Sequence, residues 1–297
     1  MTPMYAWKDR CLITKIQKAA SSTDRCKPAA AVPRQGENAF MEKEKQMPIP
    51  VILMNLTGIY DREEFWKQAG SRMELKDISG TRGYCSDEAA DRIRRRMADC
   101  PAEGLHYLDS GNYHYLTGFW TEKIQEPFDL LVFDHHTDMQ RPAFGDILSC
   151  GSWILDSIQT NGDLRRVFLV GADPELKSSV DPECEGVYQM LTAAEALADS
   201  RWLEAEPDSS DRLLYVSVDK DVLAPSVLET DWDQGTMTME ELLAVLELAR
   251  QKRPICGMDV CGEPDPEQAA ASTILASDHV NRQIMEWFQA SARQEKR

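Results

Sequence analysis

The sequence predicts an α/β fold in which a mostly parallel sheet is covered by helices on both faces. From residue 49 onward, short β-rich runs alternate with helical stretches, which is the pattern of repeated βαβ units. The run from Leu130 to Phe133 is apolar throughout, as expected of a strand buried on both faces of a sheet. Helix starts are marked by Thr-x-x-Glu capping boxes, at Thr192 and at Thr238.

The predicted elements follow one another with strands and helices interleaved. The strands are expected within residues 49–56, 104–110, 128–134, 165–173, 212–219 and 253–262. The helices are expected within residues 86–100, 192–199, 238–253 and 267–292. Ser86 is a suitable cap for the first of these helices.

Composition excludes several classes of protein. The apolar runs are strand-sized and far shorter than the ~20 residues of a membrane span. Residues 47–297 carry 24 Lys/Arg and 45 Asp/Glu, which disfavours nucleic acid and anionic membranes as partners and suits cationic substrates or metals. The eight cysteines form no CxxC pair and no secretory signal precedes them, so a cytoplasmic location is expected.

The first 46 residues differ from the rest of the chain. They are basic, contain Ala, Ser and Pro, and lack sustained periodicity. One interpretation is an organelle transit peptide; the others are a disordered tail or an upstream extension before a start at Met41 or Met47. Because no Arg-rich amphipathic face is evident, we expect residues 1–46 to be a disordered extension and residues 47–297 to form the domain.

Ionisable residues gather where the predicted strands end. In open α/β sheets, sites form at the carboxyl ends of the strands. The residues in these positions are His114, Asp134, His136, Asp138, Asp219, Asp221 and Glu263. One Asp-x-His-x-Asp motif also occurs by chance in solvated loops, but four such segments at four strand ends indicate a site.

The spacing of these residues favours two metal ions. Asp134, His136 and Asp138 are two residues apart, and two residues of strand advance about 6.6 Å. Three such side chains cannot all reach one small cation unless the chain curls, whereas two ions about 3.5 to 4 Å apart fit the spread. Nitrogen and oxygen ligands without thiolate favour Mn²⁺, with Fe²⁺, Co²⁺, Ni²⁺ or Zn²⁺ as alternatives.

Three short motifs together resemble the ureohydrolase family of arginases, agmatinases, formiminoglutamases and guanidine hydrolases. They read GNYHY, DHHTD and SVDKD, in that order, and the resemblance extends from about Ile49 to the C-terminus. It implies a three-layer α/β/α sandwich with two Mn²⁺ ions per chain. By position, one ion would be held by His114, Asp134, Asp138 and Asp219, and the other by Asp134, His136, Asp219 and Asp221.

The resemblance also implies an activity. Hydroxide bridging the two ions would attack the planar carbon of a linear amidine or guanidino compound and release an amine, so the partner would be a small cationic substrate. Glu263 is the candidate for orienting it, although it lies one residue further from Asp259 than the family pattern places it. Where many members carry a His-Gly proton shuttle, this chain has Cys150-Gly151. Family members often form trimers or hexamers, so a homo-oligomer is expected.

Two other functions remain compatible with the sequence. Amide deacetylases of the same superfamily share the architecture, but their usual single zinc does not explain six ligands. A metal-binding pseudoenzyme with a regulatory role is suggested by Cys150 at the shuttle position. His106, His135 and His279 are not placed in the site: the first two are expected to be packed or hydrogen-bonded and the third to lie at the surface or cap a helix.

Overall fold

The computed structural model describes residues 50–142, 145–204 and 212–294 of the chain. The expected extension over residues 1–46 lies outside these residues. Among the helices described, none has the length and apolar character that crossing a membrane would require.

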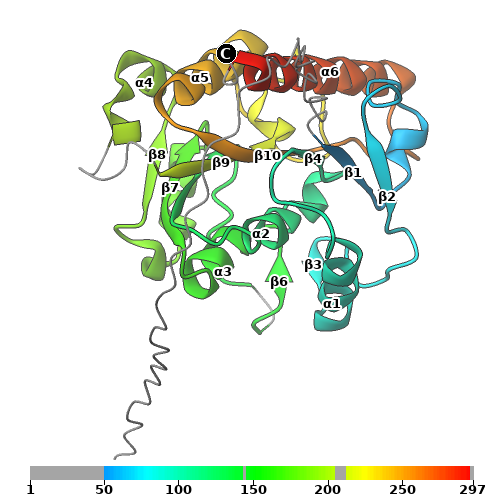
Figure 1. Cartoon of the computed structure of the whole chain (residues 1–297), viewed down its shortest axis with the longest axis horizontal. Helices are drawn as coiled ribbons and strands as arrows, with labels where there is room; N and C mark the ends of the chain where they lie inside the picture. Colours follow the sequence, from blue (N-terminus) through cyan, green and yellow to red (C-terminus); the bar gives the residue numbers. More distant parts are fainter. Residues whose placement is uncertain (1–49, 143–144, 205–211, 295–297) are drawn as a thin grey trace, which may run out of the picture. The chain divides into compact units, whose positions relative to one another are not determined.

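The centre of the molecule is a sheet of parallel strands (Figure 1). Within the described residues it has eight strands, in the order β2-β1-β4-β10-β9-β5-β7-β8. Their bounds are β1 Val51–Asn55, β2 Ser71–Glu74, β4 Leu105–Tyr107, β5 Phe128–Phe133, β7 Leu164–Val170, β8 Tyr188–Leu191, β9 Leu213–Asp219 and β10 Ile255–Cys261. A separate antiparallel pair is formed by β3 (Tyr84–Cys85) and β6 (Leu148–Ser149).

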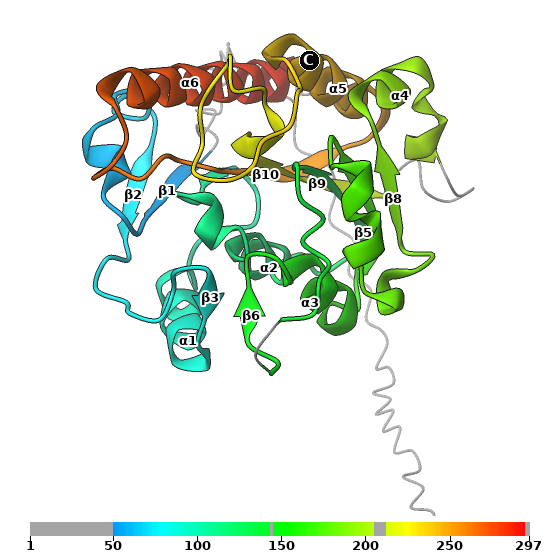
Figure 2. The same ribbon diagram turned by 180° about the vertical axis from the view of Figure 1, so that it is seen from behind.

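Helices form a layer on each face of the sheet, as Figures 1 and 2 show from opposite sides. One layer contains α4 (Ala193–Ala198), α5 (Met239–Lys252) and α6 (Ala271–Gln294), and the other contains α1 (Asp87–Arg96), α2 (Leu116–Thr121) and α3 (Trp153–Thr160). Short 3₁₀ turns connect them: η1 Ile59–Asp61, η2 Gly111–Tyr113, η3 Pro174–Ser179, η4 Pro182–Cys184, η5 Ser200–Glu204 and η6 Lys220–Val222. The predicted three-layer α/β/α sandwich is therefore confirmed.

Side chains on the two faces of the central strands pack into two separate hydrophobic cores. On β5, Leu131 and Phe133 belong to the cluster that includes residues of α5 and α6. Leu130 and Val132 point the other way, into the cluster that includes residues of α2 and α3. Because both faces are covered, every residue of this strand is buried, which explains why the run from Leu130 to Phe133 is apolar without alternation.

The predicted elements agree with the observed ones where the sequence is strongly patterned. All six predicted strands are present, Ser86 caps α1, and both capping boxes are formed. The strands β2 and β8 were not predicted because they lie at the two edges of the sheet, where no continuous apolar run is needed. The short helices α2 and α3 were also missed, since six to eight residues show little periodicity.

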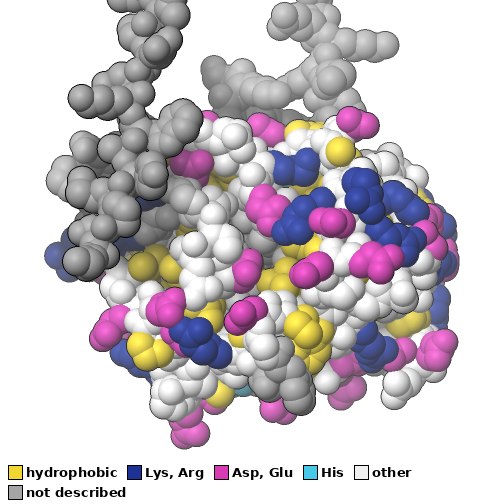
Figure 3. All heavy atoms as spheres, turned by 90° about the horizontal axis from the view of Figure 1, so that it is seen from below, with side chains coloured by type: hydrophobic (Ala, Val, Ile, Leu, Met, Phe, Trp, Pro, Cys, Tyr) yellow, Lys and Arg dark blue, Asp and Glu magenta, His cyan; other side chains and the backbone are white. Residues whose placement is uncertain are grey.

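Basic residues on α1 are paired with acidic neighbours. Arg94 contacts Glu122 at 2.6 Å, and Arg92 and Arg96 both contact Asp77, at 3.0 Å and 2.9 Å. Figure 3 views the molecule from the side on which α1 lies in Figure 1, and it shows acidic and basic side chains interspersed. These pairings reduce the positive potential at α1 and do not favour a polyanionic partner there.

Strand order brings the candidate site together. The chain forms β4, crosses to β5, and later returns to place β9 and β10 between them. Because all four strands are parallel, their carboxyl ends lie at the same edge of the sheet. The last residue of β9 and the segments after these four strands carry all seven residues that the sequence singled out at strand ends.

Candidate metal centre

The six predicted ligands meet at this edge of the sheet. Among them are two groups of three residues, and within each group the ligand atoms all lie within 4.8 Å of one another. One group is His114, Asp134 and Asp138; the other is Asp134, His136 and Asp221. Asp134 belongs to both groups, as expected of a carboxylate shared by two ions.

Each oxygen of Asp134 faces a different imidazole. Oδ2 lies 3.2 Å from Nδ1 of His114, and Oδ1 lies 3.5 Å from Nδ1 of His136. Asp138 and Asp219 approach the first imidazole, with Oδ2 atoms 3.0 Å and 3.7 Å from Nδ1 of His114. This arrangement places a carboxylate between two nitrogen donors, which suits two ions bridged by one residue.

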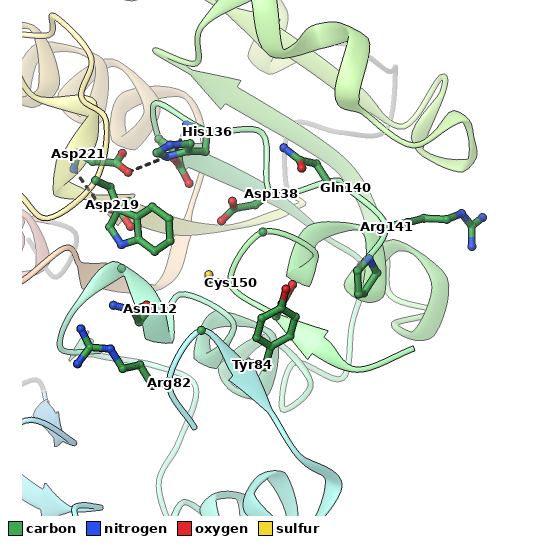
Figure 4. Close-up of a pocket in the computed structure, with 17 residues that line it drawn as sticks. Arg82, Tyr84, Asn112, His136, Asp138, Gln140, Arg141, Cys150, Asp219 and Asp221 are labelled. Carbon is green, nitrogen blue, oxygen red and sulfur yellow. Dashed lines mark hydrogen bonds and ion pairs between the residues drawn. The ribbon is translucent and has the colours of Figure 1, made fainter. Parts of the chain in front are cut away.

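The second imidazole is paired with the carboxylate that follows β9. Oδ2 of Asp221 lies 2.9 Å from Nδ1 of His136. A dashed line marks this pair in Figure 4. Asp221 lies in η6, and its backbone N–H donates to Oδ1 of Asp219 at 3.0 Å. That hydrogen bond holds the two carboxylates of the SVDKD motif in a fixed relation to each other.

The loop after β5 curls, so Asp134, His136 and Asp138 come closer together than they would on an extended strand. The backbone N–H of His136 donates to Oδ1 of Asp134 at 2.6 Å, so the chain turns directly after the strand. Asp138 has a positive φ of 50°, a conformation that non-glycine residues adopt uncommonly. Its carboxylate is held by Nε1 of Trp153, which donates to Oδ2 at 2.7 Å.

Electrostatics make a cation at this place physically reasonable. Burial, followed by the charge of Asp134, raises the pKa of Asp138 to about 7. Burial and the neighbouring carboxylates Asp219 and Asp134 likewise raise the pKa of Asp221 well above its usual value. Buried carboxylates this close cannot all ionise without compensation, and a divalent cation supplies it. The donor set therefore fits the metal that the sequence implied.

A buried hydrogen-bond chain orients His114. Oγ of Ser217 lies 2.9 Å from Nε2 of His114 and donates to Oδ1 of Asp259 at 2.6 Å. Because the serine proton goes to Asp259, Nε2 of the imidazole is the donor to Oγ. With the proton on Nε2, the neutral imidazole keeps its lone pair on Nδ1, the nitrogen that lies among the carboxylates, and this is the tautomer a metal ligand needs.

Five of the six predicted ligands, all except His114, line a cleft of about 590 Å³. Its lining includes residues that were not predicted, namely Arg82, Tyr84, Asn112, Gln140, Arg141 and Trp232. The ring of Trp232 lies 5.9 Å from that of His136, whereas the guanidinium of Arg141 points away from the cleft (Figure 4) and pairs with Asp181. Tyr84 lies in β3 and Asn112 in η2, and the other four residues lie in loops. Asn112 belongs to the GNYHY motif, whereas no motif singles out the other five.

Cys150 lines the cleft, as its position in the sequence led us to expect. It follows β6, and its backbone N–H donates to the carbonyl of Gly83 at 2.9 Å. Burial, followed by the charge of Asp138, raises the pKa of the Cys150 thiol to about 12. The thiol is thus placed near the ligand groups but is not activated by the protein groups around it.

Glu263 does not line the cleft, contrary to the role expected for it. Its carboxylate is buried and lies 2.7 Å from Nζ of Lys220, with further hydrogen bonds from Ser277 and Asn281. The difference arises one residue earlier, at Gly262, which has a φ of +89°. With the chain turned in this way, a carboxylate at position 263 points into the layer beneath α6 instead of toward the substrate space.

The remaining histidines lie outside the ligand groups. His106 is buried, stacks on Trp120 with ring centroids 3.6 Å apart, and pairs with the Tyr215 hydroxyl at 3.1 Å, as expected of a packed histidine. His135 lines a second cavity and not the cleft. His279 is exposed on α6, which agrees with the surface position predicted for it.

Comparison with known proteins identifies relatives. A family model described as "Arginase family" matches residues 110–286. A protein of Thermotoga maritima, described as uncharacterized, is 31% identical over 226 residues, which cover 74% of this chain and 82% of the relative.

Solved structures share the fold at low sequence identity. A formimidoylglutamase from Bacillus subtilis superimposes with a TM-score of 0.59 at 14% identity, covering 81% of this chain and 86% of that one. A hypothetical agmatinase from Burkholderia thailandensis gives a TM-score of 0.57 at 16% identity, covering 82% and 86%. An arginase from Medicago truncatula gives 0.55 at 16% identity, covering 81% and 87%.

Proposed function

Because the chain belongs to the arginase family, we propose that it is a binuclear metal-dependent hydrolase of a C–N bond in a linear amidine or guanidino compound. The observation that carries the proposal is the pair of ligand groups that share Asp134, all of whose members except His114 line the cleft. A site with this geometry would hold two ions with Asp134 shared between them and would leave room for a substrate in the cleft.

The residues proposed to hold the ions divide between two positions. His114 and Asp138 serve the first ion, His136 and Asp221 serve the second, and Asp134 serves both, with Asp219 as a second shared carboxylate. Mn²⁺ is the ion that the oxygen-rich set favours. When bound, the two ions supply a water activated near neutral pH and polarise the carbon under attack. Ser217 and Asp259 keep the His114 tautomer that such binding needs.

The cleft walls suit a small cationic substrate. The side chain of Trp232 is 40% exposed and lines the cleft beside His136, so its ring can face a planar cation. Asn112, Gln140 and the hydroxyl of Tyr84 add neutral polar groups to the lining. With Glu263 paired to Lys220, orientation of the guanidino or amidino group falls to these residues.

Assembly and location are further parts of the proposal. The homo-oligomer remains a proposal from the family resemblance of the sequence motifs. The six cysteines within the described part of the chain are free thiols, which suits a reducing compartment such as the cytoplasm.

The test combines metal analysis with a substrate screen. Purified protein should bind two divalent ions per chain and, loaded with Mn²⁺, release urea, ammonia or another amine from at least one compound of a guanidino and amidino panel. Asp134→Asn should lose both ions, whereas His136→Ala should keep close to one, because its imidazole serves a single position. Two ions with amide hydrolysis instead would favour the deacetylase alternative, and two ions with no turnover of either class would favour the pseudoenzyme.

A further inference from the structure

Asp219 has a thiol beside it that the six-ligand set does not include. Cys261 is the residue paired with Asp219 in the parallel register of β9 and β10. Its Sγ lies 3.0 Å from Oδ2 of Asp219, and both side chains are buried. The sulfur therefore lies against a carboxylate proposed to contact both ions.

The same sulfur is also close to an imidazole ligand. His114, Asp219 and Cys261 form a third group whose ligand atoms lie within 4.8 Å of one another, and all three residues are buried. Two of its members, His114 and Asp219, are those assigned to the first ion. An ion at that position would thus have a sulfur donor within the same small volume as its nitrogen and oxygen donors.

The local structure explains why the thiol reaches the site. Asp259 and Cys261 are two residues apart on β10, so both side chains leave the same face of the strand. Asp259 accepts a hydrogen bond from Ser217, which in turn contacts His114, whereas Cys261 contacts Asp219 directly. Gly262 lets the strand end approach closely, because a Cβ at this residue would lie 2.5 Å from Oδ1 of Asp219.

We propose that Cys261 supplies a sulfur ligand to the ion at His114, and that this position consequently prefers a thiophilic ion such as Zn²⁺, Co²⁺ or Fe²⁺ over Mn²⁺. The inference rests on the proposed metal function. On binding, the S–H bond is broken, its proton passes to solvent, and the sulfur electron pair forms the bond to the ion, with no change of oxidation state. Thiolate ligands favour zinc and iron, whereas manganese prefers carboxylate, carbonyl and water oxygens.

The alternative role for Cys261 is structural. A thiol can remain protonated, donate a weak hydrogen bond to Asp219 and fill a small apolar space. In that case the ion would have only nitrogen and oxygen neighbours, and replacing sulfur by oxygen would not change metal preference. The two roles therefore differ in a property that can be observed without turnover.

The full-length protein loaded with Zn²⁺ or Co²⁺ provides the test. X-ray absorption of the zinc form should show a sulfur neighbour at about 2.3 Å in addition to nitrogen and oxygen at about 2.0 to 2.2 Å. The cobalt form should show a sulfur-to-metal charge-transfer band in the near ultraviolet. Cys261→Ser should lose both signals, and its preference for Zn²⁺ over Mn²⁺ in competition should fall by at least about tenfold.

Two other cysteines serve as controls. Cys256 lies on the same strand, and its thiol contacts the carbonyl of Leu214 at 3.5 Å, so Cys256→Ser should keep both signals. Cys150 lines the cleft, whereas Cys261 does not, and Cys150→Ser should keep both signals as well. Loss of the sulfur signal in Cys150→Ser with its retention in Cys261→Ser would overturn the assignment. Should Cys261→Ser fail to fold, Cys261→Ala replaces it in all three measurements.

Failure of this proposal can be told from failure of the proposed function. Two ions per chain without a sulfur neighbour would remove Cys261 from the site and leave the binuclear centre intact. A single ion with sulfur that depends on Cys261 would support the present assignment and contradict the binuclear model.

Discussion

Oγ of Ser217 lies 2.9 Å from Nε2 of His114, on the side of the imidazole opposite the carboxylates. Removing this contact should free the ring to rotate or to change tautomer. For Ser217→Ala we expect affinity for one of the two ions to fall by about 10- to 100-fold, as is typical when the partner of a ligand histidine is lost. Titration calorimetry would measure it. Ser157→Ala, a buried serine on α3, is the control and should bind both ions normally. Equal affinities in the two variants would contradict the orienting role of Ser217.

The ion pair between Glu263 and Lys220 should matter for stability more than for substrate binding. Both side chains are fully buried, and their closest atoms are 2.7 Å apart. In Glu263→Gln the Lys220 ammonium loses its charged partner, which should lower the free energy of unfolding by about 3 kcal/mol or more. Urea denaturation would measure this change.

The control for this substitution is Glu267→Gln, an exposed position in the following turn, which should change stability by less than about 0.5 kcal/mol. Normal stability in Glu263→Gln together with a large rise in KM would instead restore the substrate-orienting role that the family pattern suggested for Glu263.

Glu63 should make stability depend on pH. Burial, followed by the charge of Glu263, raises the pKa of Glu63 to about 10. When a carboxyl pKa is higher in the folded protein than in the unfolded chain, its contribution to stability is fully present only below the unfolded pKa. That contribution is lost as the pH rises toward the folded pKa. Glu63→Gln does not titrate, so it should be more stable than the parent protein at neutral pH. Its advantage should grow from about pH 4.5 to about pH 10, by at most about 1.4 kcal/mol per unit.

The measurement is urea denaturation over a series of pH values. Glu64→Gln is the matched control, since the neighbouring side chain of Glu64 is 71% exposed and makes only a surface pair with Lys67. An advantage of Glu63→Gln that stays constant with pH would show that Glu63 does not hold a proton in the folded protein.

Cys150 should not take part in proton transfer. Its thiol lies in the cleft near Asp138, but burial raises its pKa to about 12, and a thiol relays protons poorly compared with an imidazole at neutral pH. Cys150→Ser should keep both ions and most of kcat on whichever substrate the screen identifies. A fall of ~10²-fold or more in kcat with both ions bound, the size expected for a general acid or base, would make Cys150 a participant.

The sequence by itself determined the sheet and the neighbourhood of the site. Strands such as Leu213–Asp219 are mostly apolar because both faces of a parallel sheet are covered, so the apolar run in the sequence reveals them. Parallel strands end at one edge, and for that reason His114, Asp134 and Asp219 could be grouped before any coordinates were known. Edge strands lack such a pattern because their residues are exposed or half-buried, and helices as short as α2 and α3 have too few residues to show a period.

Only the tertiary structure decided which side chains touch. The two-residue alternation within a strand tells which residues share a face, but the neighbour across the sheet depends on strand order and register, which packing of the whole chain sets. Cys261 came to lie beside Asp219 because β10 inserts next to β9 in that register. Glu263 turned toward Lys220 because the chain at Gly262 adopts a positive φ and brings its backbone against the ligands. Both outcomes join segments about 40 residues apart, a separation over which local sequence preferences carry no information on contact.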